Sequence, residues 1–189
     1  MKISSDAFER AKKIKLIIFD VDGVLTDSKI NIGVNGELFK TFNCRDGFGI
    51  TTAQKIGFKT AIITGRRSPC TEHRARELKI NSVKQGQMNK RNAYKELKEE
   101  FGVTDEQVAY VADDIIDLPV FVQVGFRAAV GDAAEEVKER AHLVTVNVGG
   151  NGAVREVLEF ILKAQGKWDK IIKQYTTVED LGGDYDLMQ

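Results

Sequence analysis

Residues 15–26, KLIIFDVDGVLT, constrain the fold of this chain more than any other segment. Four consecutive apolar residues, 16–19, run directly into Asp20, a pattern typical of a strand buried on both faces of a parallel sheet. Asp20 and Asp22 are two residues apart, so in extended geometry both carboxylates leave the chain on the same side. Gly23 permits a sharp turn directly after them. Because ligands bind at the carboxyl ends of strands in open α/β sheets, this pair marks a candidate site.

The composition predicts one globular domain without a bulk charge bias. The chain has 189 residues, of which 42% are hydrophobic, which is enough for one well-buried core. Its 28 Lys and Arg residues equal its 28 Asp and Glu residues in number, so no overall field favours nucleic acid or an anionic membrane as a partner. The two cysteines, Cys44 and Cys70, and the lack of an apolar leader or membrane-spanning run lead us to expect a cytoplasmic protein.

Strand and helix patterns alternate along the rest of the chain. A short helix is expected over 5–13, and extended runs at 29–32 and 37–42 flank an Asn-Gly turn that predicts a projecting hairpin. Further strands are expected at 60–63, 82–85, 108–112, 127–130 and 143–146, and helices at 46–55, 69–78, 90–101, from about 132, and over 153–162.

This alternation predicts an α/β fold with a doubly wound, Rossmann-like parallel sheet. Helices should cover both faces, and a small β-hairpin flap should follow the first strand. We expect a single capless domain over residues 1–166 and a C-terminal tail over 167–189.

Polar residues follow several of the predicted strands. Thr64 follows the strand at 60–63, Lys90 begins a helix, and Asp113 and Asp114 follow the strand at 108–112. The carboxyl ends of parallel strands share one edge of a sheet, so these residues should lie near Asp20. Carboxylates that gather within a few ångströms repel one another unless a cation neutralises them, and oxygen ligands with room for water suit Mg²⁺. The sequence therefore predicts a magnesium site.

Such a cluster can transfer a phosphoryl group. One carboxylate can attack phosphorus and form an aspartyl phosphate, while metal and ammonium neutralise charge on the equatorial oxygens. A second carboxylate two residues on can protonate the leaving alkoxide and later deprotonate water. The spacing of Asp20 and Asp22 thus has a chemical reason.

Four segments together resemble the motifs of the haloacid dehalogenase superfamily of phosphatases: FDVDGVLTD, IITGR, the lysine of GQMNK, and ADDIIDLP. Over about residues 14–165 the chain is most similar to the small, capless members that act on 3-deoxy-D-manno-octulosonate 8-phosphate. The resemblance implies a Mg²⁺-dependent phosphoric monoester hydrolase of lipopolysaccharide precursor synthesis. It also implies a homotetramer in which a hairpin from one subunit helps to enclose the site of the next.

The resemblance further implies roles for single residues. Asp20 would be the nucleophile and a metal ligand, and Asp22 would be the general acid and base and would offer its backbone carbonyl to the metal. Thr64 would donate a hydrogen bond to a phosphoryl oxygen, and Lys90 would pair with the charge of that oxygen. The remaining metal contacts would come from Asp113, a direct ligand, and from Asp114, which would orient metal-bound water.

The same resemblance places arginines and the segment after the hairpin near the sugar acid. Arg66 and Arg74 could bind its carboxylate in bidentate fashion. The other members of this substrate-binding set, beside Asp22 and Lys90, are Asn43, Cys44, Arg45, Asp46 and Gly47.

Several alternatives stay open at this point. Asp114 and Asp117 could instead cap the helix that follows them, and the glycines at 149–152 fit a tight turn because no Walker lysine follows. Ala112 stands where the fourth motif of the family usually begins with glycine, and Thr51 stands where several relatives carry arginine.

The substrate could therefore also be a nonulosonate 9-phosphate or a broader set of sugar phosphates. A catalytically silent binding subunit is the non-enzyme alternative, against which the complete catalytic set argues. The acidic residues near the C-terminus predict that the tail does not line the substrate site, because they would repel a phosphorylated acid.

Overall fold

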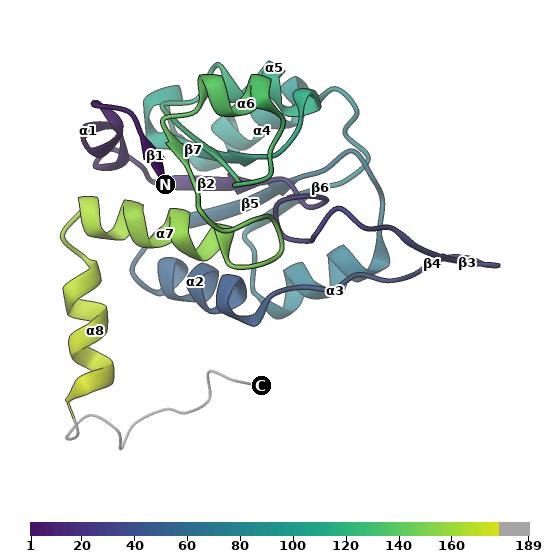
Figure 1. Ribbon diagram of the computed structural model, residues 1–189, viewed down its shortest axis with the longest axis horizontal. Helices are drawn as coiled ribbons and strands as arrows, with labels where there is room; N and C mark the ends of the chain where they lie inside the picture. Colours follow the sequence, from purple (N-terminus) through teal and green to yellow (C-terminus); the bar gives the residue numbers. More distant parts are fainter. Residues whose placement is uncertain (178–189) are drawn as a thin grey trace.

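The computed structural model describes residues 1–177 of the chain, and a seven-stranded sheet forms the centre of this part (Figure 1). The strands of the sheet are β1 (Lys2–Ile3), β2 (Leu16–Phe19), β5 (Lys59–Ile63), β6 (Ser82–Lys84), β7 (Val108–Ala112), β8 (Phe126–Ala129) and β9 (Leu143–Val144). Their order is β1-β9-β8-β7-β2-β5-β6. The pairs from β9 through to β6 are parallel, and β1 pairs antiparallel with β9.

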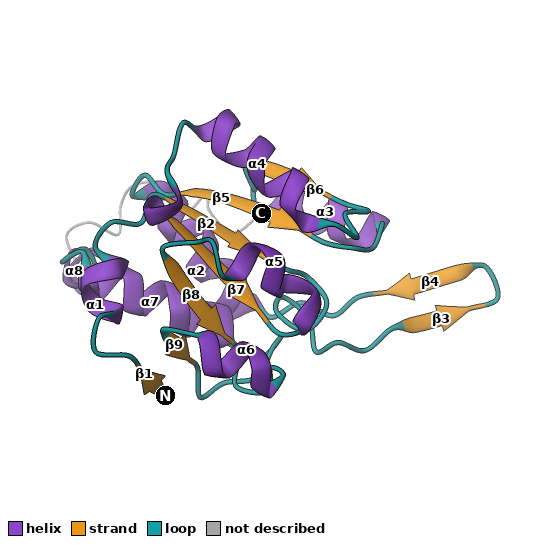
Figure 2. Ribbon diagram, turned by 90° about the horizontal axis from the view of Figure 1, so that it is seen from above, coloured by secondary structure: helices purple, strands orange, loops and turns teal. Residues whose placement is uncertain are grey.

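Helices cover both faces of the sheet. The α-helices are α1 (Ala7–Ala11), α2 (Cys44–Lys55), α3 (Pro69–Glu77), α4 (Lys90–Phe101), α5 (Leu118–Phe121), α6 (Glu135–Arg140), α7 (Ala153–Ala164) and α8 (Trp168–Thr176). Figures 1 and 2 place α2, α3 and α7 on one face and α4, α5 and α6 on the other. The prediction of a doubly wound α/β sheet is thereby confirmed.

The order of the strands reverses at β2, which lies between β5 and β7. The chain runs from β2 to β5 and β6 on one side and returns to β7, β8 and β9 on the other. Phe19, the last residue of β2, lies opposite Ile62 of β5 and Val111 of β7. The residues that follow these three strands therefore meet at one edge, in the crevice that a reversal of strand order opens. β2 and β7 are completely buried, as their unbroken apolar sequences require.

The predicted hairpin is also confirmed, and it projects from the body of the molecule (Figure 2). Its strands are β3 (Asn31–Gly33) and β4 (Gly36–Phe39). Gly33 pairs with Gly36 across the turn, and Gly36 has a φ of 105°, which favours glycine. The hairpin follows β2 and the turn after it, so its base lies beside the crevice.

Three helices begin at other residues than expected, and a side-chain cap accounts for one of them. The helix expected over 5–13 is α1, at Ala7–Ala11. The helix expected from Asp46 begins at Cys44, since the side chain of Asn43 accepts hydrogen bonds from the backbone N–H groups of Arg45 and Asp46, at 2.8 and 3.4 Å. The helix expected near Asp132 begins three residues later, at Glu135.

The C-terminal segment begins with a helix that the sequence analysis did not predict. α8 follows α7 within the segment assigned to the tail, at 167–189. The acidic residues from 179 onward, which were predicted not to line the substrate site, lie outside the described residues. Within residues 1–177, no helix combines the length and the apolar character needed to cross a bilayer.

Candidate active site

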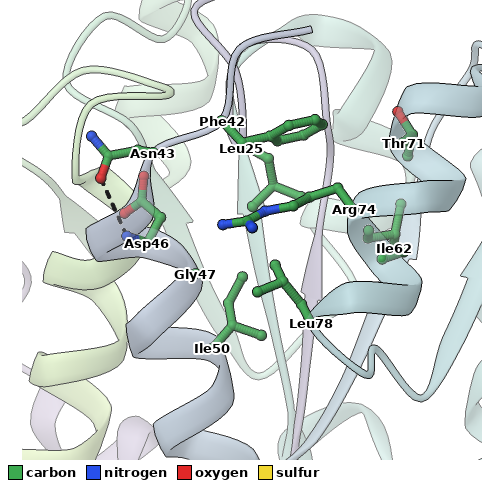
Figure 3. A pocket seen from close by; sticks show the side chains of 11 residues that line it. Leu25, Phe42, Asn43, Asp46, Gly47, Ile50, Ile62, Thr71, Arg74 and Leu78 are labelled. Carbon is green, nitrogen blue, oxygen red and sulfur yellow. Dashed lines mark hydrogen bonds between the residues drawn. The ribbon is translucent and has the colours of Figure 1, made fainter. Parts of the chain in front are cut away.

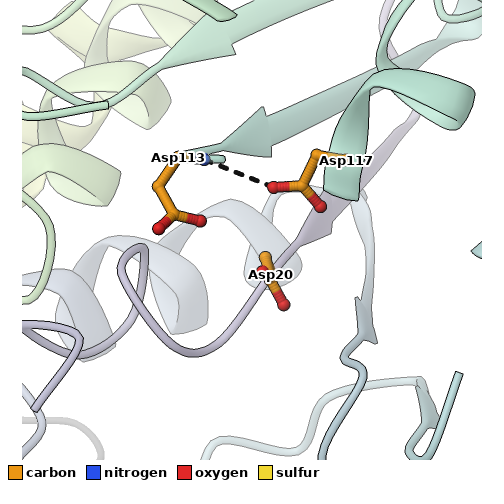
Figure 4. Close-up of side chains that lie close together, drawn as sticks. All are labelled: Asp20, Asp113 and Asp117. Carbon is orange, nitrogen blue, oxygen red and sulfur yellow. Dashed lines mark hydrogen bonds between the residues drawn. The ribbon is translucent and has the colours of Figure 1, made fainter. Parts of the chain in front are cut away.

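Three carboxylates meet at the crevice (Figure 4). Asp20 follows β2, Asp113 follows β7, and Asp117 ends the 3₁₀ turn Ile115–Asp117; one oxygen of each lies within 4.8 Å of the others. Oδ1 of Asp20 and Oδ1 of Asp113 are buried and have no hydrogen-bond partner among residues 1–177. Buried carboxylate oxygens are costly unless a cation or a donor meets them, so this pair requires a positive partner.

Lys90 supplies part of the positive charge. It is the first residue of α4, its side chain is 1% exposed, and its Nζ lies 3.0 Å from Oδ2 of Asp20 and 2.6 Å from Oδ1 of Asp117. Asp117 also accepts hydrogen bonds from the Tyr110 hydroxyl at 2.8 Å and from the backbone N–H of Asp113 at 3.3 Å. Both oxygens of Asp117 are thus engaged, and the residue holds Lys90 in place.

The contacts of Asp117 with Lys90 and Tyr110 decide whether its side chain caps the following helix, an alternative that the sequence left open. Its side chain makes no capping hydrogen bond to α5 and belongs instead to the acidic cluster. Asp114 is exposed and does form a local bond, because its Oδ1 accepts a hydrogen bond from the N–H of Ile115 at 2.7 Å.

Burial and mutual repulsion make the carboxyl groups reluctant to ionise. Burial, followed by the charges of Asp20 and Asp117, raises the pKa of Asp113 to about 8. Burial and Asp117 also raise the pKa of Asp20, although Lys90 opposes this shift. Burial disfavours the charge of Lys90, but attraction to Asp20 and Asp117 outweighs it and raises the Lys90 pKa. Such strongly shifted carboxyl groups are typical of functional sites.

The turn after β2 packs tightly against Asp113. Gly23 has a φ of 94°, and a Cβ atom at this position would lie 1.9 Å from Oδ2 of Asp113. Glycine is required both by the backbone angle and by this approach. In contrast, Ala112 ends β7 in an extended conformation, so this departure from the family pattern needs no glycine.

Asp22 lies at the mouth of the crevice between two cations. Lys40 Nζ contacts its Oδ1, and Nε of Arg66 lies 3.8 Å from its Oδ2. Thr64 follows β5 and is buried, and its Oγ1 accepts a hydrogen bond from the N–H of Arg66 at 3.4 Å. Sequence reasoning missed Lys40, because no local pattern shows which carboxylate a lysine after a hairpin will meet.

Arg74 lies in a neighbouring pocket, where it points from α3 toward the start of α2 (Figure 3). Its guanidinium group lies over the ring of Phe42, 5.9 Å from the centroid, and donates to Glu77 at 2.8 Å. A Cβ atom at Gly47 would lie 2.4 Å from Nη2 of Arg74, so the glycine makes room for the guanidinium group. A groove outside this pocket joins Arg74 to Lys40 and Cys44.

Within the expected substrate-binding segment, Asp46 has its carboxylate engaged elsewhere. Its Oδ2 accepts a hydrogen bond from the N–H of Gly152 at 3.1 Å, and its Oδ1 accepts one from the N–H of Arg155 at 2.7 Å. The carboxylate joins α2 to the start of α7. Asn43 caps α2, whereas Cys44 and Arg45 are exposed.

Comparison with known proteins identifies the family. Residues 77–158 match the family model of haloacid dehalogenase-like hydrolases. The chain is 48% identical to 3-deoxy-D-manno-octulosonate 8-phosphate phosphatase of Escherichia coli strain K12 over 168 residues, which cover 89% of each chain. The chain belongs to the 3-deoxy-D-manno-octulosonate 8-phosphate phosphatase family.

Solved structures of this phosphatase family share the fold. The enzyme from Yersinia pestis is 48% identical with a TM-score of 0.85, over 87% of this chain and 89% of that one. The enzyme from Moraxella catarrhalis, solved with magnesium, phosphate and the sugar acid, is 38% identical with a TM-score of 0.88, over 90% and 98% of the chains. The predicted superfamily and the predicted class of phosphoric monoester hydrolase are confirmed.

The carboxylates of this octulosonate phosphatase family member fit a magnesium ion. The two oxygens without partners come from Asp20 and Asp113, on neighbouring strands, and both are hard ligands. The prediction of Mg²⁺ as cofactor is confirmed by this cluster together with the magnesium-bound relative.

Proposed function

We propose that this protein hydrolyses 3-deoxy-D-manno-octulosonate 8-phosphate to the free sugar acid and phosphate with Mg²⁺. The observation that carries the proposal is the placement of Asp20, whose Oδ2 lies 3.0 Å from Lys90 Nζ and whose Oδ1 is buried without a partner. A carboxylate held in this way, beside a cation and a fixed ammonium group, is suited to attack phosphorus. Family membership at 48% identity supplies the substrate.

The metal ligands in this proposal are Asp20, Asp113 and the backbone carbonyl of Asp22, and Asp114 orients water at the site. The unpartnered oxygens of Asp20 and Asp113 support this assignment. When bound, Mg²⁺ neutralises charge on the phosphoryl oxygens and fixes their orientation. Asp117 is not a ligand in this scheme, because Lys90, Tyr110 and a backbone N–H already engage its oxygens.

The first chemical step transfers the phosphoryl group to Asp20. Its carboxylate oxygen forms a bond to phosphorus while the bond from phosphorus to the sugar oxygen breaks, which gives an aspartyl phosphate. Lys90 and the Thr64 hydroxyl contact a phosphoryl oxygen and stabilise its charge in the transition state. Asp22 donates its proton to the departing sugar oxygen.

The second step releases phosphate. Asp22, now ionised, takes a proton from a water molecule, whose oxygen attacks phosphorus as the bond to Asp20 breaks. Phosphate leaves, and both Asp20 and Asp22 return to their starting states.

The sugar acid is bound beside this centre in the groove and pocket next to α3. Arg66 and Arg74 pair with its carboxylate, and Asn43, Cys44, Arg45 and Gly47 line the approach. The position of Arg74 against Gly47 supports this assignment. Asp46 does not contact the sugar in this assignment; it positions the same segment by fixing the start of α2 to α7.

The protein acts as a homotetramer in this proposal, with the hairpin of one subunit covering the next subunit's site. Support comes from the apolar side chains that the hairpin exposes, among them Ile32 and Val34, which are 69% and 102% exposed. The cytoplasmic location stays a prediction from the sequence.

Phosphate release from sugar phosphates, with Mg²⁺ and with a chelator, tests the function. We expect Mg²⁺-dependent turnover of the octulosonate phosphate in preference to a nonulosonate 9-phosphate and to sugar phosphates that lack a carboxylate. Asp20→Asn should lower this turnover by at least about a thousandfold. Asp6→Asn, the same change at an exposed residue paired with Arg10, is the control and should retain activity. Full hydrolysis by Asp20→Asn would refute the covalent mechanism.

A further inference from the structure

Lys40 is buried to an unusual degree for a lysine at the base of a projecting hairpin. Its side chain is 2% exposed, and its Nζ contacts Oδ1 of Asp22 and lies 3.3 Å from Oε1 of Glu37. A buried ammonium group is costly to desolvate unless carboxylates surround it. Two carboxylates do so here, and one of them belongs to the proposed general acid and base.

Glu37 ties this lysine to the body of the protein. Its side chain is 13% exposed, and its Oε2 accepts a hydrogen bond from the hydroxyl of Ser68. Ser68 is itself the N-cap of α3 and accepts a hydrogen bond from the N–H of Thr71 at 3.2 Å. A continuous line of polar contacts therefore runs from α3 through Glu37 and Lys40 to Asp22.

The two oxygens of Asp22 differ as a result. Oδ1 is held by the buried Lys40, whereas Oδ2 faces the half-exposed Arg66 across 3.8 Å. A separation of 3.8 Å is too long for a hydrogen bond, so Oδ2 is the oxygen that is free to exchange a proton.

We propose that Lys40 is the positioning residue of Asp22: it anchors one carboxylate oxygen and thereby presents the other to the leaving oxygen of the substrate. This inference rests on the proposed function, because it takes Asp22 as the general acid and base. Other atoms of Lys40 line the groove, but its ammonium group lies between Asp22 and Glu37, contacts neither phosphorus nor the sugar in this assignment, and acts only through Asp22. The hairpin thus contributes to catalysis within its own subunit.

The leaving group separates this role from a structural one. A sugar alkoxide is a strong base and needs a proton in the transition state, whereas p-nitrophenolate is a weak base and departs without one. The ratio kcat/KM covers only the steps up to departure of the alcohol, so the hydrolysis of the aspartyl phosphate does not enter it. Misplacing Asp22 should therefore lower kcat/KM for the sugar phosphate and spare that for p-nitrophenyl phosphate.

The experiment compares wild type, Lys40→Met, Asp22→Asn and the double variant on both substrates with saturating Mg²⁺. We expect Lys40→Met to lower kcat/KM for the octulosonate phosphate by about tenfold to a hundredfold, and to leave kcat/KM for p-nitrophenyl phosphate nearly unchanged. The double variant should match Asp22→Asn, because a residue that acts only through Asp22 has nothing further to lose. Lys98→Met is the control. Lys98 lies in α4, and its Nζ lies 2.8 Å from Oδ1 of Asp105, away from the site.

Three results would overturn the proposal. The first is an equal loss of kcat/KM on both substrates by folded Lys40→Met, and the second is a loss of kcat/KM that multiplies with that of Asp22→Asn. The third is a rise in KM alone, which would indicate direct contact with substrate. If Lys40→Met does not fold, Lys40→Gln, which keeps a hydrogen-bond donor, is tested by the same comparison. A wild-type enzyme that hydrolyses p-nitrophenyl phosphate but not the octulosonate phosphate would refute the proposed substrate. The Lys40 comparison would then be made on the sugar phosphate that it does hydrolyse.

Discussion

At the scale of single residues, the site is organised by charges that compensate one another in a buried space. Lys90 is shared between Asp20 and Asp117, and Asp117 is itself held by Tyr110. Burial raises the pKa of Asp113 to about 8, and the charges of Asp20 and Asp117, which one ammonium group cannot neutralise, add to this shift. This imbalance leaves a place for a divalent cation and makes binding of that cation depend on pH.

The first prediction is that Mg²⁺ stabilises the protein more strongly as the pH rises. Burial and the neighbouring carboxylates raise the pKa of Asp113 from 3.8 to about 8 in the metal-free fold. Between these values the folded state holds a proton that the unfolded chain has lost, so the metal-free fold loses stability with rising pH. Mg²⁺ needs the ionised carboxylate and must displace this proton, which weakens its apparent affinity at low pH by up to about tenfold per pH unit.

Thermal unfolding with Mg²⁺ and with a chelator, from pH 6 to pH 9, measures this effect. The increase in Tm due to Mg²⁺ should grow across this range and should largely vanish in Asp113→Asn at every pH. A magnesium-dependent increase that is the same at pH 6 and pH 9 would contradict the assigned protonation of the cluster.

The sequence revealed those residues whose position follows from the end of a strand. Asp20 and Asp113 follow unbroken apolar runs, so their convergence could be predicted from the parallel sheet alone. Asp117 and Lys40 could not be assigned in the same way. Their roles depend on partners 27 and 18 residues distant in the chain, Lys90 and Asp22, which no local pattern specifies.

At the scale of helices and strands, the candidate site depends on how α2 is fixed to α7. Asp46, in the first turn of α2, accepts hydrogen bonds from two backbone N–H groups at the start of α7. The N–H of Arg155 is one of the donors in the first turn of α7, which have no partner within the helix. Burial raises the pKa of Asp46 despite these bonds, so the negative charge itself is not favoured there.

The second prediction follows from this balance between hydrogen bonds and charge. Asp46→Ala leaves two buried donors without an acceptor and should lower the free energy of unfolding by about 1–2 kcal/mol. Asp46→Asn keeps one acceptor oxygen, replaces the other by an NH2 donor that faces a backbone N–H, and removes a disfavoured charge, so it should cost less than Asp46→Ala without being neutral. Urea unfolding of both variants tests the difference. Equal destabilisation by the two substitutions would mean that the one hydrogen bond that Asn can still accept does not help to hold α2 to α7.

Most elements could be predicted from the sequence, and those that were missed had different causes. α8 carries an amphipathic pattern that the analysis of the tail did not use. The apolar strands, the Asn-Gly hairpin and the helices capped by Ser68 and Asn89 follow from local chemistry. β1 has only two residues and exists because Lys2 and Ile3 pair with β9, 140 residues away. α2 begins two residues before the predicted start because the side chain of Asn43, which the resemblance places near the substrate, caps the helix.

At the scale of the whole molecule, the hairpin carries apolar side chains that the rest of residues 1–177 does not cover. It extends away from the sheet (Figure 2), and several of its large apolar side chains are exposed. Ile32 is 69% exposed, Val34 is 102% exposed and Leu38 is 63% exposed. An apolar surface of this kind marks a protein interaction site, and in the proposed homotetramer a second copy of this chain covers it.

The last prediction concerns the double variant Ile32→Ser with Val34→Ser. Replacing these side chains removes apolar area from the proposed interface and leaves Lys40 at the hairpin base in place. Ile32 pairs with Glu37 across the hairpin, so the contact of Glu37 with Lys40 is checked by measuring kcat for the octulosonate phosphate, which loss of that contact should lower. Light scattering coupled to gel filtration should show a tetramer for wild type and smaller species for the variant.

Kinetics provide a second measurement on the same variant. If the hairpin helps to enclose the neighbouring site, KM for the octulosonate phosphate should rise severalfold, whereas p-nitrophenyl phosphate, which needs no sugar contacts, should be hydrolysed as before. Ile3→Ser, at an exposed apolar residue of β1, should change neither property. A variant that stays tetrameric with an unchanged KM, or a wild type that is monomeric, would show that the hairpin serves its own subunit alone.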